Sequence, residues 1–287
     1  MSVLRVLVLS VVQGLAELLP ISSSAHVVVA EKLMGMDPSA PEMTLLLVSL
    51  HTGTMLAVIV YFWTRWRRTF FRTREGFTEL ATLLVLPTAV TGLVGGVLVM
   101  AVENVLLRRD PRQAEVEQLF SHLELIAPAL ALVGVLIVMA SVLDARRART
   151  DEGPALTSEQ ALLIGAVQGL SLPFRGFSRS GATISTGMLA GVDKRRAEEF
   201  SFALAVILTP VVVIREAWRL IKAGHLSQVN LTSTIMMDLL GALCAFVVGV
   251  LALKWLSRWL ENGRWYWFGL YCLVASGAVA LLHYAGY

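Results

Sequence analysis

The chain has 287 residues, of which 56% are hydrophobic and only 16% are charged, and its mean hydropathy is +0.70. Soluble proteins of this size have about a quarter charged residues, so the composition excludes an ordinary soluble protein and predicts a polytopic membrane protein. The net charge of +3 is interpreted as loop arginines that set topology and contact lipid headgroups, not as a nucleic-acid-binding surface.

The first predicted element is a short helix over about residues 2–16, followed by a break and a second short helix over about 23–34. No basic segment precedes residues 3–12, so we expect this helix to belong to the mature protein and not to a cleaved signal peptide. A helix of 15 residues spans only about 22 Å, whereas the hydrocarbon core is about 30 Å thick. The pattern therefore predicts a re-entrant hairpin whose break is buried in protein or faces water.

Three full crossings follow, and the second half of the chain then repeats the order. The first crossings are predicted at about 44–63, 80–101 and 124–143. Two short helices are predicted next, at about 159–171 and 180–191. The last crossings are predicted at about 197–214, 235–256 and 265–284.

The two halves also share a sequence motif. Val-Gln-Gly-Leu occurs at 12–15 and again at 167–170, and one extra residue in the second copy aligns Ser22–Ser24 with Ser178–Ser180. Because each copy is followed by an odd number of crossings, the second copy must enter from the opposite face. The predicted fold is all-α, with six transmembrane helices and two re-entrant hairpins in an inverted repeat. The repeats are predicted over 1–150 and 151–287 of one membrane domain.

The positive charges predict an orientation in the membrane. The predicted loop 64–78 contains Arg65, Arg67, Arg68, Arg72 and Arg74. With this loop in the cytoplasm, the cytoplasmic side has more Lys and Arg than the other side, as bacterial membrane proteins require. Both termini then face the periplasm or the cell exterior, and we expect the cavity that the hairpins line to open to the same side.

Two other residue types have structural interpretations. Cys244 and Cys272 both lie in apolar runs and are interpreted as small packing residues, not as a disulfide or a metal site. A tryptophan-rich stretch near the C-terminus is interpreted as an interfacial aromatic belt. Its members are Trp255, Trp259, Trp265 and Trp267. His51, in a glycine-containing crossing, is interpreted as structural.

The first hairpin combines ionisable and hydroxyl side chains within an apolar segment. Gln13 and Glu17 are four residues apart and share one helix face, and Pro20 is expected to end that helix. Ser22–Ser24 then open the next helix, whose hydroxyls and free backbone N–H groups suit a phosphate. His26 follows in its first turn. Ionisable groups inside a membrane usually mark function, so we interpret this hairpin as half of an active site.

The second hairpin supplies positive charge. Ser178, Arg179, Ser180 and Thr183 surround another helix start, after a break at Pro173. The planar guanidinium of arginine binds phosphate oxygens in pairs. A hydroxyl, a carboxylate, an imidazole, an arginine and two helix N-termini together suit phosphoryl transfer.

The residues leave two questions open. Chemistry alone does not decide which of the three serines attacks. Glu17, with Gln13 beside it, is also suited to binding a hard divalent cation through oxygen.

The motifs QGLAELLPISSSAH (13–26) and GFSRSGAT (176–183) resemble those of the bacterial undecaprenyl-diphosphate phosphatases, the bacitracin-resistance family, over nearly the whole chain. The resemblance implies an inner-membrane enzyme that removes the terminal phosphate of undecaprenyl diphosphate with Mg2+ or Ca2+. Its product is the carrier lipid of peptidoglycan synthesis. The resemblance further implies Ser23 as the nucleophile, Glu17 or His26 as the proton-transfer group, Arg179 as the diphosphate clamp and Glu17 as a metal ligand.

Most of the remaining site positions follow from the same resemblance, whereas Ser24 and Arg175 are predicted from the chemistry of the two hairpins. Predicted substrate-binding residues are Gln13, Ser22, Ser24, Arg175, Ser178, Ser180 and Thr183. Two positions differ from the usual family site: Gln13 brings no charge to a position where the family has Glu or Gln, and Pro173-Phe174-Arg175-Gly176 replaces Pro-Gly. Arg175 is interpreted either as a second phosphate contact or as a headgroup-level arginine.

The expected partners are the polyprenyl diphosphate substrate and membrane lipids, without nucleic acid, and a homodimer is compatible with the sequence. The alternative function is a transporter or flippase of a polyprenyl phosphate lipid, because inverted repeats with broken helices are typical of transporters.

Overall fold

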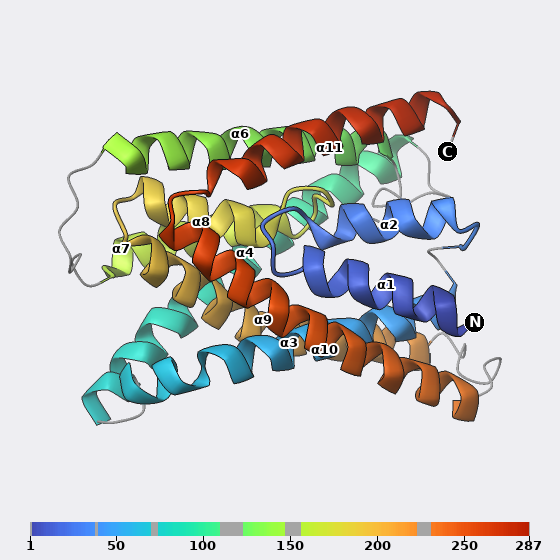
Figure 1. The fold of residues 1–287 in the computed structure, drawn as a ribbon, viewed down its shortest axis with the longest axis horizontal. Helices are drawn as coiled ribbons and strands as arrows, with labels where there is room; N and C mark the ends of the chain where they lie inside the picture. Colours follow the sequence, from blue (N-terminus) through green and yellow to red (C-terminus); the bar gives the residue numbers. More distant parts are fainter. Residues whose placement is uncertain are drawn as a thin grey trace. The chain divides into compact units, whose positions relative to one another are not determined.

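The structure is a computed structural model that describes residues 2–37, 40–69, 74–109, 123–146, 156–222 and 231–286. Within these ranges all regular secondary structure is helical (Figure 1). The helices are α1 (Val3–Ala16), α2 (Ser23–Leu33), α3 (Pro41–Thr69), α4 (Arg74–Arg109), α6 (Leu123–Arg146), α7 (Ser158–Ser171), α8 (Arg179–Leu189), α9 (Lys194–Lys222), α10 (Leu231–Glu261) and α11 (Tyr266–Tyr284). The all-α class and the four short helices are therefore confirmed.

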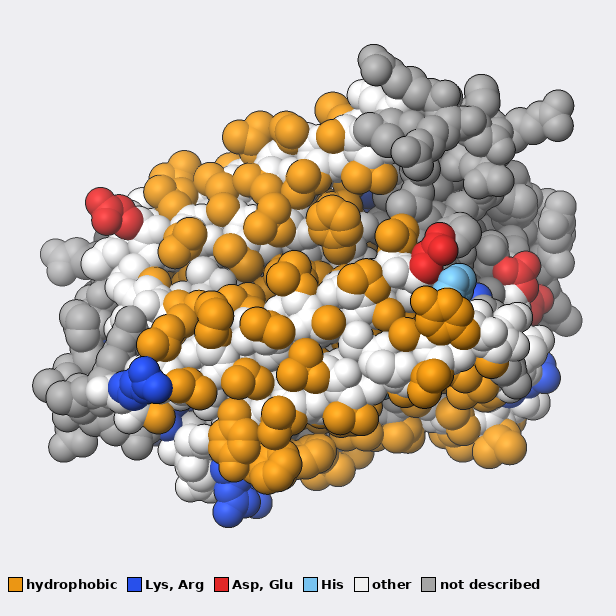
Figure 2. Space-filling model, turned by 90° about the horizontal axis from the view of Figure 1, so that it is seen from above, with side chains coloured by type: hydrophobic (Ala, Val, Ile, Leu, Met, Phe, Trp, Pro, Cys, Tyr) orange, Lys and Arg blue, Asp and Glu red, His pale blue; other side chains and the backbone are white. Residues whose placement is uncertain are grey.

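Six of the described helices are long and apolar enough to cross a membrane, which confirms the six predicted crossings. These spans are Glu42–Arg68, Ala81–Val102, Leu123–Arg146, Lys194–Arg215, Thr234–Glu261 and Tyr266–Tyr284. Hydrophobic side chains cover most of the face drawn in Figure 2, where charged side chains are few. The protein is thus a multi-pass membrane protein whose apolar surface suits lipid.

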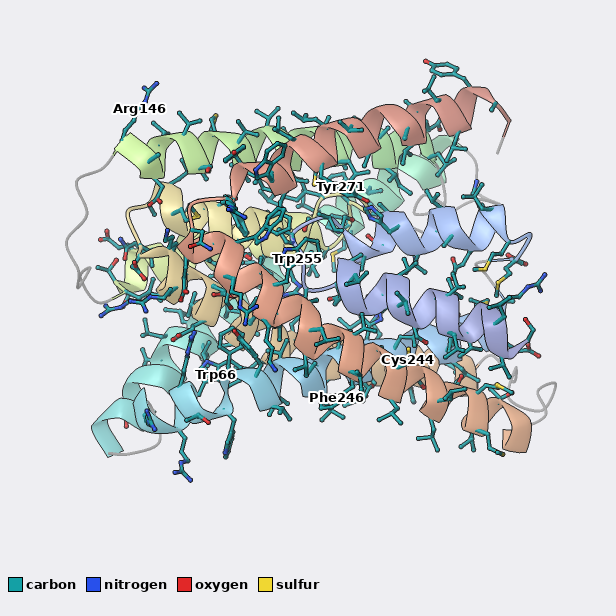
Figure 3. All side chains as sticks on the ribbon, in the orientation of Figure 1. Trp66, Arg146, Cys244, Phe246, Trp255 and Tyr271 are labelled. Carbon is teal, nitrogen blue, oxygen red and sulfur yellow. The ribbon has the colours of Figure 1, made fainter. Side chains whose placement is uncertain are left out.

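The arginine-rich stretch predicted as a loop is largely helical. Helix α3 continues to Thr69 and α4 begins at Arg74, so Arg65, Arg67 and Arg68 lie on the last turns of α3. Arginine is a good helix former, and helix continues readily beyond the apolar segment because its backbone bonds are internal. A similar basic end closes α6, where Arg146 extends away from the helix (Figure 3).

The chain forms two compact units, each containing helices from both predicted repeats. The first unit is Met1–Leu19, Ser23–Arg65 and Ala205–Leu256; the second is Pro20–Ser22, Trp66–Leu204 and Ser257–Tyr287. In the first unit α1, α3 and α10 share a core. Its fully buried residues include Leu9, Leu50 and Ala245. This core packs the first turns of α1, the helix that leads to Glu17, against α3 and α10.

The repeated Gln-Gly pair packs in the same way in each unit. In the first unit, a Cβ on Gly14 of α1 would lie 2.8 Å from Cβ of Val248 on α10. In the second unit, a Cβ on Gly169 of α7 would lie 2.8 Å from the carbonyl oxygen of Thr91 on α4. Each short helix therefore needs glycine to approach a long span from the other half of the chain.

In the second unit, α6 and α11 run side by side (Figure 1) and approach closely at Gly134 and Gly269. Trp265, just before α11, is buried, and its Nε1 donates to Ser185 Oγ at 3.1 Å. The aromatic-belt prediction is thus wrong for Trp265, because an indole N–H in the interior must find an acceptor and here bonds α8. Trp255 and Trp267 are exposed.

Candidate active site

Glu17 lies at the C-terminal end of α1, directly after its last regular residue, Ala16. A turn covers the next residues, in which the N–H of Glu17 bonds to the Gln13 carbonyl (2.9 Å) and the N–H of Leu19 bonds to the Leu15 carbonyl (3.0 Å). Regular helix therefore ends at Ala16, in agreement with the predicted range 2–16, and a turn leads from there to Pro20. Pro20 restricts the residue before it, so regular helix gives way to a turn within the preceding residues.

Three side chains converge on one oxygen of the Glu17 carboxylate, Oε2. Gln13 Nε2 donates to it at 3.1 Å and Ser23 Oγ donates at 2.5 Å. His51 Nε2 lies 3.6 Å from the same oxygen. All four residues belong to the first unit. The structure thus brings together Gln13, Glu17 and Ser23 of the predicted set. It also adds His51, which was interpreted from the sequence as a structural residue.

His51 is the functional candidate that sequence reasoning missed. It lies on α3, and its Nδ1 is 2.7 Å from the carbonyl oxygen of Leu47, one turn earlier. A histidine inside an apolar crossing is itself a signal, since polar side chains are rare there unless they serve a site. That signal does not identify the partner, which comes from another helix.

The two residues beside Ser23 differ in backbone conformation and place. Ser22 has φ 71°, the one left-handed non-glycine residue within the described ranges, and its side chain is buried. Such a conformation costs about 1–3 kcal/mol and is typical of functional sites. Ser24 and His26 follow in the first turn of α2, both half-buried.

The arginine motif forms the beginning of α8 in the second unit. Ser178 caps the helix, because its Oγ accepts from the N–H of Gly181 at 3.2 Å. Arg179 is the first residue of the helix, and Ser180 is buried beside the cap, with the two Oγ atoms 3.5 Å apart. A guanidinium at a helix N-terminus combines two anion-binding features.

Thr183 has a packing contact. Its hydroxyl donates to the Arg179 carbonyl (2.7 Å) and lies 2.5 Å from Ser201 Oγ on α9. It is completely buried. Thr183 therefore holds the first turn of α8 against α9. Arg175 lies half-buried in the turn before α8.

The tip of the first hairpin, Pro20–Ser22, belongs to the second unit, as does α8. Cys272 Sγ on α11 lies 3.6 Å from the carbonyl oxygen of Pro20, and a Cβ on Gly181 would be 3.0 Å from that same oxygen. The loop that separates Glu17 from Ser23 thus packs against the first turn of α8. Cys272 is a free, buried packing residue, as predicted.

The donor set is compatible with a hard cation that the substrate helps to bind. Among the described residues, no cluster of three or more His, Cys, Asp and Glu side chains could hold a metal by itself. Mg2+ commonly uses one or two carboxylates together with water and substrate phosphates. Glu17 fits such a role.

The arrangement has the parts of a nucleophilic site. A hydroxyl that donates to a carboxylate has a base in place to take its proton. These features define a polytopic helical membrane protein with a serine–carboxylate pair and a helix start that carries an arginine.

Comparison with known proteins gives the family. Residues 6–278 match the family model described as bacitracin resistance protein BacA, so the chain belongs to this family. It is 52% identical over 286 residues to undecaprenyl-diphosphatase 2 of Acinetobacter baylyi, covering 98% of each chain. It is 35% identical to undecaprenyl-diphosphatase 1 of Burkholderia pseudomallei, over 96% of this chain and 95% of the other. It is 32% identical to undecaprenyl-diphosphatase of Rhodopirellula baltica, over 98% of each.

Proposed function

We propose that the protein hydrolyses undecaprenyl diphosphate to undecaprenyl phosphate and inorganic phosphate, which recycles the carrier lipid for peptidoglycan synthesis. The observation that carries this proposal is the 2.5 Å hydrogen bond from Ser23 Oγ to Glu17 Oε2. A transporter of a phosphate lipid needs positive charge, but it does not need a hydroxyl paired with a base. The relatives named undecaprenyl-diphosphatase, one of them 52% identical, support the same conclusion.

Ser23 is the nucleophile in the proposed reaction. Its Oγ attacks the terminal phosphorus while its proton passes to Glu17, and the bond from that phosphorus to the bridging oxygen breaks. Undecaprenyl phosphate leaves, and water then hydrolyses the phosphoserine to return Ser23 and release phosphate. Two proton-transfer groups are expected from the sequence, Glu17 and His26. Glu17 is favoured because it accepts the hydrogen bond from the Ser23 hydroxyl.

The positive charge comes from the start of α8. Arg179 is proposed to clamp the diphosphate, with Arg175 as a second contact, while Ser178 and Ser180 shape the helix start. The packing of Pro20–Ser22 against the first turn of α8 supports the view that both motifs act on one substrate. Ser24 and His26 at the start of α2, with Thr183, complete the proposed binding set.

A divalent cation, Mg2+ or Ca2+, is proposed to bind at Glu17, with Gln13 beside it. When bound, it would offset the negative charge of the diphosphate. Glu17 would then hold both the cation and the proton of the nucleophile.

The two halves of the chain, 1–150 and 151–287, are proposed to form an inverted repeat with re-entrant hairpins. Supporting this, α1 packs on α10 and α7 packs on α4 through equivalent glycines, so each short helix contacts the second span of the other half. With α1 and α7 too short to cross, the hairpins return to the side they enter. The charge distribution supports an inner-membrane protein whose site opens to the periplasm or cell exterior. A homodimer stays a prediction.

Phosphate release by purified protein in detergent tests the function. We expect turnover of C15 and C55 prenyl diphosphates that EDTA abolishes, and that Ser23→Ala and Arg179→Ala each remove. Ser10→Ala is the matched control, because Ser10 is a buried serine of α1 whose hydroxyl bonds to the Val6 carbonyl. Well-folded wild-type protein that releases no phosphate from any of several prenyl diphosphates would instead favour the transporter.

A further inference from the structure

His51 is held rigidly beside the proposed base. Its Nδ1 donates to the Leu47 carbonyl oxygen at 2.7 Å, which fixes the ring plane and directs Nε2 toward Glu17; the protonated ring then attracts the carboxylate. The turns of α3 that lead to it are anchored, because Leu46 and Leu50 are completely buried in the core of the first unit. The ring therefore has a defined place with respect to α1.

Glu17, in contrast, needs help to stay in one orientation. It follows the last regular residue of α1, and a glutamate side chain has several rotatable bonds whose freedom opposes order. To accept the Ser23 proton, Oε2 must remain directed at the hydroxyl. Gln13, from the same helix face, donates to this oxygen, and His51 approaches it from α3.

We propose that His51 is a positioning residue for Glu17: it keeps the carboxylate facing Ser23. This role rests on the proposed function, since it acts through the base of that reaction. The Nε2–Oε2 distance of 3.6 Å is longer than a hydrogen bond, and the contact is with Glu17. His51 thus acts through the Glu17 carboxylate, whose orientation it sets.

Three substitutions of His51 distinguish the contributions of its two ring nitrogens. His51→Phe keeps a ring but removes both. His51→Gln places an amide near the position of Nε2, and His51→Asn places one near the position of Nδ1. Thr52→Val is the matched control, because the Thr52 hydroxyl bonds to the Val48 carbonyl (2.9 Å) in the same way one residue further along α3. Each variant is assayed for phosphate release with C15 prenyl diphosphate, and its elution and melting temperature in detergent are recorded.

We expect His51→Phe to lower kcat by about 100-fold with KM within about twofold, because misplacing a reacting group by about 1 Å has an effect of this size. His51→Gln should recover kcat to within about tenfold of wild type, whereas His51→Asn should have a kcat near that of His51→Phe. The control Thr52→Val should have the kcat of the wild type. If His51→Phe does not fold, the kcat values of His51→Gln and His51→Asn are compared instead, and a higher kcat for His51→Gln supports the role.

Three results would overturn the role. They are an unchanged kcat in His51→Phe, recovery by asparagine as good as by glutamine, and a loss that appears in KM alone. Wild-type protein that releases no phosphate would refute the proposed function and, with it, this role. If the wild-type protein is active and the His51 variants have the same kcat, this role is refuted while the proposed function stands.

Discussion

Replacing Glu17 with Gln tests the central bond of the proposed site, because glutamine has nearly the same shape but cannot take the Ser23 proton. General-base catalysis contributes about 10²- to 10⁴-fold to rate, so kcat should fall about 1,000-fold, or about 4 kcal/mol. Glu17 acts through Ser23, so the double variant Glu17→Gln, Ser23→Ala should lose no more than Ser23→Ala alone. The coupling energy of the cycle should then be nearly the whole effect of Glu17→Gln.

Single-turnover phosphate release from a C15 prenyl diphosphate at saturating Mg2+ is the assay for all four proteins of the cycle. Losses that multiply, so that the double variant falls about 1,000-fold below Ser23→Ala, would show that Glu17 and Ser23 act independently. Full recovery of Glu17→Gln at higher Mg2+ would show that Glu17 binds the cation and is not the base. Either result would refute the reasoning from the Ser23–Glu17 bond.

Three further predictions follow from the structure. Arg179→Lys should lower kcat/KM about 10- to 100-fold, because it loses one paired charge-assisted hydrogen bond of about 1.5–3 kcal/mol; steady-state kinetics measure this, and unchanged values would contradict the clamp. Gly14→Ala and Gly169→Ala should each destabilise the protein by about 1–3 kcal/mol through overpacking, seen as lower melting temperatures in detergent. Gly277→Ala, where a Cβ meets nothing within 4 Å, is the control, and equal melting temperatures would count against close packing. Arg146→Cys should react with a membrane-impermeant maleimide only after the cells are opened, and labelling of intact cells would reverse the proposed orientation.

The helices were largely predictable because their signals are local. The apolar length of each crossing gave its position, and α7 begins at Ser158, where Thr157 and Gln160 form a capping box that the sequence displays. Helix ends were less predictable. The basic end of α3 continues as helix to Thr69, because nothing in that stretch breaks a helix.

The site was predictable only where its residues share a helix. Gln13 and Glu17 meet at the spacing of one helical turn, which periodicity gives directly. The Ser23–Glu17 bond crosses a break, and its geometry depends on the left-handed Ser22, which no pattern of residue types specifies. His51 lies on another helix, so only tertiary packing brings it to Glu17.

The two copies of the Gln-Gly motif differ in the chemistry that their glutamines meet. Gln13 donates to Glu17, whereas Gln168 donates to Thr91 Oγ1 at 3.4 Å, and the residue four positions after Gln168 is Leu172. The first copy therefore retains a carboxylate and the second does not. A single base is sufficient to activate one nucleophile, and a second carboxylate would repel the diphosphate that Arg179 is proposed to bind. The proposed repeat would account for the matching helices, while the difference at these positions would give one copy the proposed nucleophile and the other the proposed positive charge.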